Sequence, residues 1–148
     1  MIIHYITLIL EMIFLFLMFK GAVEDWNTRV ISNRTWICAN ITSLVIAILR
    51  GYSVKQILVY SSWLFLLFVI VEIINVCITK KEGIGGGDIK IAPAVTLYSG
   101  PIGSYVILIV LILSLIGQTW SKKVDSKYNP LVTYFFIGCV FTFIYLLN

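Results

Sequence analysis

The chain has 148 residues, of which 60% are hydrophobic and 12% charged, with a formal net charge of +4 and a mean hydropathy of +1.01. Soluble domains are roughly 45–50% apolar and about 25% charged. The apolar residues occur in long runs, so the composition excludes an ordinary soluble domain and predicts an all-α polytopic membrane protein.

Six apolar segments are predicted to span the membrane as one integral-membrane domain over residues 1–148. The first lacks the basic start and small-residue cleavage site of a signal peptide, so we expect a permanent span. A polar loop over residues 20–34 is predicted to follow it, and Gly100–Pro101 marks a turn. The six spans are expected over about residues 2–19, 31 or 35 to 49, 56–78, 84–99, 102–119 and 130–147.

The basic residues predict which loops face the cytoplasm. Cytoplasmic loops carry the excess of Lys and Arg. With six spans and the N-terminus outside, the outside loops hold two basic residues, Arg50 and Lys55. The inside loops then hold nine, which are Lys20, Arg29, Arg34, Lys80, Lys81, Lys90, Lys122, Lys123 and Lys127. Omitting the weak fourth span gives six against five, so the charges favour six spans with both chain ends outside.

The cysteine and histidine content argues against metal chemistry. Cys38, Cys77 and Cys139 are isolated in or beside apolar segments, without the spacing of metal ligands, and are interpreted as small apolar groups. His4, the only histidine, lies at the N-terminus without ligand partners, so we do not expect a zinc or histidine-based triad mechanism. We expect no metal, no cofactor and no nucleic-acid partner.

Two aspartates are the candidate reactive groups. Asp25 lies in the first predicted cytoplasmic loop and Asp88 in the second, 63 residues apart. The predicted topology places both at a similar membrane depth, so the two carboxylates can meet. The structural alternatives are that Asp88 caps the following helix and that Asp25 is a solvated charge beside Arg29.

The other acids have weaker claims to function. Glu11 and Glu72 lie deep in predicted spans, where acids are costly. Neither has a motif around it, and Glu72 can reach Asn75 on the same helix face. We interpret both as residues that make packing or polar contacts.

Paired carboxylates could hydrolyse a peptide without a metal. Two close carboxylates share one proton, so that one accepts a proton from water while the other donates to a carbonyl oxygen. Glycines before Asp88 would let an extended peptide approach the backbone closely, beside Gly85–Gly87.

The motifs around both aspartates resemble those of the type IV prepilin peptidases. The stretch Gly85–Asp88, "GGGD", fits the Gly-x-Gly-Asp signature of membrane aspartyl proteases, and Ile89–Lys90 continues it as in that family. The stretch Asp25–Asn33, "DWNTRVISN", resembles Asp-x-x-x-Arg-x-Ile-Pro-Asn. Ser32 stands where proline is usual, which is expected to relax the turn into the second span.

The resemblance implies a membrane aspartyl endopeptidase of the bacterial cytoplasmic membrane. Such an enzyme cleaves the basic leader from prepilin-like proteins at the cytoplasmic face. Asp25 and Asp88 would be catalytic, and Gly85 and Gly87 would support the site. The similarity is to short members, including those of tight-adherence pilus systems, without the cysteine pairs associated with N-methylation.

Several roles stay open beside this interpretation. Glu24 and Glu82 either attract a basic leader or are solvated loop charges. Arg29 and Lys90 either hold the anionic pair or anchor at lipid headgroups. The alternatives for the whole chain are a relative with other substrates, a non-enzymatic membrane scaffold, or a small transporter subunit. The double aspartate motif favours the peptidase.

Topology reporters test the charge-based prediction of six spans. Fusions after Leu49 and Gly100 should report an outside location, and a fusion after Lys123 should report the cytoplasm, because nine of the eleven basic residues then lie inside. A cytoplasmic signal from the fusion at Gly100 would contradict the six-span arrangement.

Overall fold

The computed structural model describes residues 2–28, 30–79, 86–103, 105–106, 109 and 131–147. Every regular element in this part of the chain is a helix, which confirms the predicted all-α class. The elements are α1 (Ile2–Thr28), α2 (Asn33–Leu49), α3 (Val54–Thr79), α4 (Gly86–Ser99), the short 3₁₀ helix η1 (Gly100–Ile102) and α6 (Leu131–Leu147). Most of the predicted fifth span lies outside the described residues.

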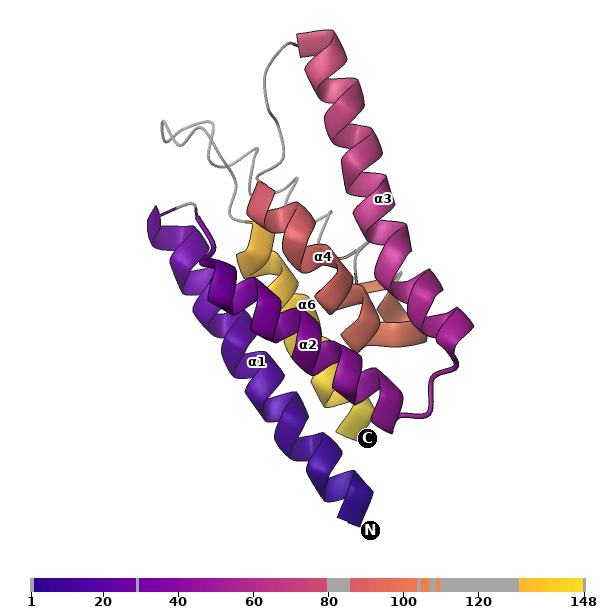
Figure 1. Cartoon of the computed structure of the whole chain (residues 1–148). Helices are drawn as coiled ribbons and strands as arrows, with labels where there is room; N and C mark the ends of the chain where they lie inside the picture. The colour runs from indigo at the N-terminus through magenta and orange to yellow at the C-terminus, as the bar shows by residue number, and fades with distance from the viewer. Residues whose placement is uncertain are drawn as a thin grey trace.

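Helices α1 to α4 alternate in direction along the bundle (Figure 1). Helix α1 ends, and α2, α4 and α6 begin, at the same end of the molecule, which we call the site end (residues 24–35, 86–91 and 131–132). Both chain termini lie toward the opposite end (Figure 1). This arrangement agrees with termini on one side of a membrane, while the outside orientation stays a prediction.

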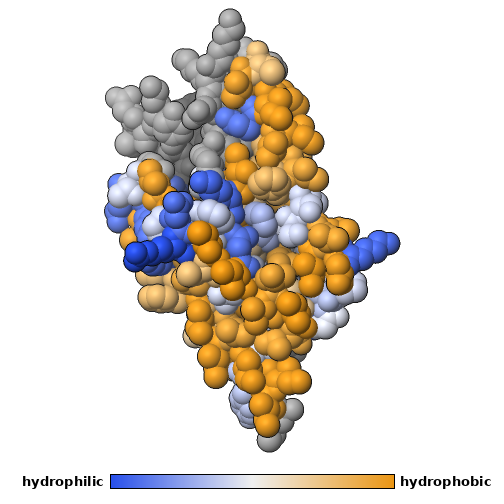
Figure 2. Space-filling view, viewed as in Figure 1, coloured by the Kyte–Doolittle hydropathy of each residue, from blue (hydrophilic) through white to orange (hydrophobic). Residues whose placement is uncertain are grey.

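Helices α1 and α3 are long and apolar enough to cross a membrane. Their most apolar windows have mean hydropathies of 2.3 and 2.5, and only 17% and 12% of those windows are buried. A core helix of a soluble protein would be mostly buried, whereas these helices turn apolar side chains outward (Figure 2). Helices α2 and α6 have 17 residues each, just under the roughly 20 needed for an untilted span.

Helix α4 forms the centre of the bundle. It packs against α2, α3 and α6. Its inward residues include Ala92, Ala94 and Thr96, which are fully buried. Small and weakly polar side chains let neighbouring helices approach closely in a membrane. This packing explains why α4 has the weakest hydropathy of the predicted spans and yet is a helix.

Helix α1 extends further than predicted. The sequence predicts a polar loop over residues 20–34, but the helix continues to Thr28. Gly21 and Ala22 are buried, so this part of the helix packs inward and is stabilised by tertiary contacts. The Thr28 hydroxyl donates to the Glu24 carbonyl at 2.8 Å and so provides a hydrogen-bond partner for one carbonyl of the last turn. Asp25 therefore lies on a helix and not in a loop.

A buried ion pair joins three segments at the end opposite the site. Arg50 Nη2 lies 2.8 Å from Glu11 Oε1, and the same guanidinium donates to the Tyr98 carbonyl and lies 5.0 Å from the centre of the Tyr98 ring. Phe14 stacks on Tyr98 with 4.4 Å between ring centroids. The interpretation of Glu11 as a residue in a polar contact is confirmed, and its partner is Arg50.

Substitution of Glu11 should destabilise the fold. The size of the effect should depend on whether the new side chain can accept a hydrogen bond from Arg50. Glu11→Ala leaves the Arg50 guanidinium without its carboxylate, at a cost of about 3 kcal/mol. We expect the unfolding midpoint in detergent to fall by roughly 6–12 °C. Glu11→Gln keeps an acceptor oxygen and should show a smaller shift. Met12→Ala, at a neighbouring side chain that is 55% exposed, is the control. Equal midpoints for Glu11→Ala and Met12→Ala would show that the pair adds nothing.

Candidate active site

Two contacts define how α1 and α4 are aligned. Near one end Phe14 stacks on Tyr98. Further along, α1 faces α4 at Gly21, where an added Cβ would lie 3.7 Å from Ile91 Cδ1. The contact residues are seven positions apart on each helix. Their numbers increase from Phe14 to Gly21 on α1 and decrease from Tyr98 to Ile91 on α4. The two helices are therefore antiparallel and keep one register between these contacts.

This register brings Asp25 and Asp88 to the same level at the site end. Asp25 lies four residues beyond Gly21, and Asp88 lies three residues before Ile91, so each acid shares a helix face with its contact residue. At 1.5 Å per residue, the two steps are about 6 Å and about 4.5 Å in the same direction. Both aspartates are buried, with 7% of each residue exposed.

The buried positions contradict the simpler interpretations of the two acids. Asp25 is not a solvated loop charge, because it lies on the inner face of α1. Asp88 is the third residue of α4 and not the residue that precedes it, so it is not the N-cap. A negative charge in the first turn is still favourable to the helix dipole. A role in stabilising α4 does not explain why Asp25 is buried at the same level.

Gly87 is the point of closest approach between the start of α4 and the connection from α1 to α2. A Cβ on Gly87 would lie 2.9 Å from Cδ1 and 3.2 Å from Cγ1 of Ile31. Real Cβ atoms essentially never come this near, so any larger residue here would require the buried Ile31 side chain to shift. Gly87 is helical, and the described glycines with positive φ are Gly51 and Gly100, so backbone conformation does not account for a glycine at position 87.

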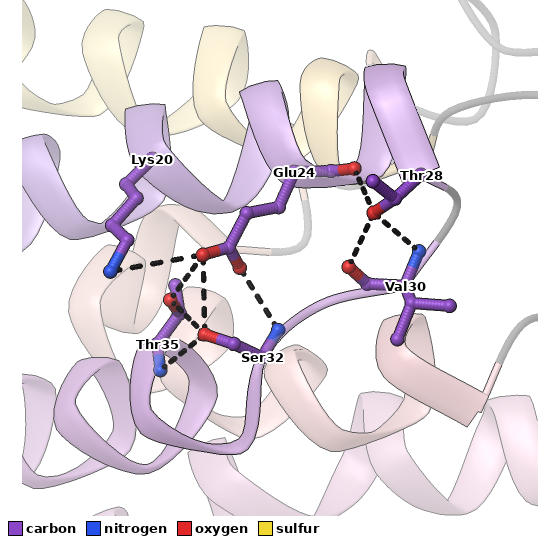
Figure 3. A network of polar contacts seen from close by, with 6 residues as sticks. All are labelled: Lys20, Glu24, Thr28, Val30, Ser32 and Thr35. Atoms are coloured by element: carbon purple, nitrogen blue, oxygen red, sulfur yellow. Dashed lines mark hydrogen bonds and ion pairs between the residues drawn. The ribbon is translucent and has the colours of Figure 1, made fainter.

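Ser32 holds the start of α2 by its side chain and its backbone. Its φ and ψ are −62° and 144°, and its hydroxyl accepts from Thr35 N at 3.3 Å, as an N-cap does. Its N–H donates to Glu24 Oε2 at 2.9 Å (Figure 3). The prediction that serine relaxes this turn is wrong, because hydrogen bonds fix the residue at a φ that proline also adopts.

Other polar contacts join α2 to α4 just below the acids. The Asn40 side chain donates to the Lys90 carbonyl at 3.0 Å, and Lys90 Nζ lies 5.6 Å from the centre of the Trp36 ring. Figure 2 shows hydrophilic side chains gathered where α1 ends and α2 begins. The site end is therefore the more polar end of this face of the bundle.

Several predicted residues cannot be placed at the site. Gly85, Glu82 and Arg29 lie outside the described residues. Glu72 is half-buried on α3, and the side chain of its suggested partner, Asn75, is not described. Within the part of the chain that the structure describes, no three His, Cys, Asp or Glu side chains gather as a metal site. Independence from metals stays a prediction.

Sequence reasoning missed Ile31 as the partner of Gly87 and Glu24 as the acceptor for the start of α2. Ile31 matches the motif that carries Asp25, and this was the only available signal for its role. Glu24 adjoins Asp25, and the Ser32–Thr35 spacing is typical of a helix N-cap. Neither pattern shows which segments meet in space.

The chain belongs to a family of membrane peptidases that remove leader peptides. Residues 12–147 match the model of the type IV leader peptidase family, which includes both aspartates and all helices at the site end. The resemblance of the two aspartate motifs to that family is thereby confirmed. No curated protein and no solved structure matches the chain.

Alanine at the glycines tests the packing of α4 against Ile31. Gly87→Ala should greatly reduce peptide cleavage, because its Cβ would displace Ile31 and the first turn of α4 that carries Asp88. Gly85→Ala should have an intermediate effect, and Gly86→Ala the least. Cleavage is measured in membranes, with expression checked by immunoblot.

A second substitution distinguishes space from other roles of Gly87. Ile31→Val removes Cδ1, the atom nearest to the added Cβ. The double variant Gly87→Ala/Ile31→Val should therefore recover part of the lost cleavage. Full activity of Gly87→Ala alone would contradict the steric explanation.

Proposed function

We propose that this chain is an aspartyl endopeptidase in which Asp25 and Asp88 form the catalytic pair. The observation that carries the proposal is the register of α1 and α4, which places two buried acids at one level. Membership of the type IV leader peptidase family supports the reaction class. A scaffold has no need for two buried acids at one level.

The two carboxyl groups would act together on a peptide bond. Close carboxyls hold one proton between them, since two neighbouring negative charges are unfavourable. The ionised group takes a proton from water as the water oxygen attacks the carbonyl carbon. The protonated group donates to the carbonyl oxygen. Collapse of the tetrahedral intermediate breaks the C–N bond, and the leaving amine takes up a proton from the pair.

The proposed substrate is a prepilin or pilin-like protein with a short basic leader followed by an apolar helix. The predicted topology puts Asp25 and Asp88 at the cytoplasmic face, where the leader of such a substrate lies. The outward-facing apolar surfaces of α1 and α3 support a location in the lipid bilayer. We propose the bacterial cytoplasmic membrane as that bilayer, with six spans and both termini outside.

Removal of either carboxyl should abolish cleavage. Asp25→Asn and Asp88→Asn are nearly isosteric but cannot shuttle a proton. Each should therefore reduce prepilin cleavage by about 100-fold or more, since an acid–base group contributes about 100- to 10,000-fold. Cleavage is followed as the size shift of a co-expressed prepilin. Normal cleavage by either variant would refute the catalytic pair.

Two controls accompany this measurement. Glu72→Gln replaces an acid on α3 and should leave cleavage unchanged, provided that each variant is present in the membrane at an equal level. Treatment of the same membranes with EDTA should also leave the rate unchanged, because the proposed reaction uses no metal.

A further inference from the structure

The carboxylate of Glu24 receives three hydrogen bonds from the start of α2. Ser32 N donates to Oε2 at 2.9 Å, while Ser32 Oγ and Thr35 Oγ1 each donate to Oε1 at 3.2 Å (Figure 3). Lys20 Nζ adds an ion pair at 3.7 Å. The ion pair lies within α1, whereas the three hydrogen bonds join the last turns of α1 to the first turn of α2.

The connection between α1 and α2 carries Ile31, which packs against the start of α4. Ile31 precedes Ser32, is 7% exposed, and fills the space where a Cβ of Gly87 would lie. Gly87 in turn precedes Asp88. A shift of Ser32 away from Glu24 would move Ile31 and release the first turn of α4. Glu24 therefore acts on Asp88 through Ile31, although it is adjacent to Asp25.

We propose that Glu24 is a positioning residue that fixes the spacing between Asp25 and Asp88. This inference rests on the proposed function, because it assigns Glu24 to the same acid pair. It replaces the interpretation that Glu24 attracts a basic leader. Its two oxygens accept from the protein's own donors and face the start of α2, and its side chain is 23% exposed. Glu24 touches no reacting atom and is not a catalytic residue.

The backbone of Ser32 permits a sharp test. Its φ of −62° is the value to which a proline ring would hold it. In Ser32→Pro the Cδ atom of the ring takes the place of the amide hydrogen. The nitrogen that lies 2.9 Å from Glu24 Oε2 can then no longer donate, and the ring carbon crowds the carboxylate. When Ser32→Pro is combined with Glu24→Ala, the proline ring has room. The ring then holds φ at residue 32 at the value that the hydrogen bonds fix in the unmodified protein. Each single variant should be impaired, and the double variant should recover.

The kinetic experiment measures prepilin cleavage by the purified full-length protein in lipid vesicles. Glu24→Ala and Ser32→Pro should each lower kcat by about 10-fold or more, since a misplacement of about 1 Å can cost about 100-fold. KM should stay the same, because substrate binding is not altered. The double variant should have a kcat closer to that of the unmodified enzyme than either single variant. Lys20→Gln removes the exposed ion pair but keeps the hydrogen bonds, so it should match the unmodified enzyme.

Three outcomes would overturn the proposal. If Glu24→Ala and Glu24→Gln both raise KM while kcat is unchanged, Glu24 acts on the substrate by its charge. If Glu24→Ala lowers the unfolding midpoint but keeps kcat per folded molecule, Glu24 only stabilises the fold. Additive losses in the double variant would also contradict the coupling of Glu24 to Ser32.

A distance measurement tests the positioning without any substrate. Spin labels on cysteines at Val30 and Lys90, in a background without the three native cysteines, report the connection relative to α4; both positions are exposed. Glu24→Ala should broaden or shift the distance distribution, and the added Ser32→Pro should narrow it again. Unchanged distances would refute the positioning role even if cleavage is lost. If the unmodified enzyme does not cleave prepilin but the distances respond as expected, the proposed substrate is wrong and the positioning role stands.

Discussion

The packing of α1 and α4 against the same two helices, α2 and α6, is the constraint on which the rest of the structure depends. Two carboxyls can share a proton only when they are a few ångströms apart, and side chains of that length require closely packed backbones. A Cβ on Gly21 would touch Thr35 of α2 and Val132 of α6, and a Cβ on Gly87 would lie 2.9 Å from Ile31 Cδ1, so these glycines let α1 and α4 lie close to the segments between them. Membrane helices commonly associate through small residues in this way. Gly21 lies four residues before Asp25 and Gly87 directly precedes Asp88, so each acid follows a closely packed glycine on its own helix.

The charges at the two ends of the bundle are handled differently. At the end with the chain termini, Glu11 is neutralised by Arg50, and the pair is nearly buried between α1 and α2. Such a pair holds the two helices in register. At the site end two acids lie at one level, while the donors around Glu24 are occupied by that residue. The proposed acid–base pair therefore lies at the opposite end of the bundle from the ion pair of Glu11.

The sequence was sufficient for the class of fold and the choice of candidate acids, but not for their mutual placement. Long apolar runs predict membrane helices because burial in lipid requires them, and the two aspartate motifs point to a leader peptidase. Hydropathy alone fails at residues 20–28, where buried Gly21 and Asp25 keep the helix intact through tertiary contacts. The contacts of Ile31 with Gly87 and of Ser32 with Glu24 join segments whose pairing depends on the register of whole helices. No local pattern encodes that register.

The unexpected length of α1 has a consequence for where hydrolysis can take place. The apolar run from Ile2 to Phe19 is 18 residues, about 27 Å as a helix, which is close to the roughly 30 Å of a bilayer's hydrocarbon core. Asp25 lies six residues further, or about 9 Å, which is the depth of the headgroups if this run spans the bilayer as we propose. Water is present there, and a carboxyl is far less costly than in hydrocarbon. A substrate with a polar leader and an apolar helix changes character at that same depth, so the length of α1 matches the position of the acids to the junction that the proposed reaction cuts.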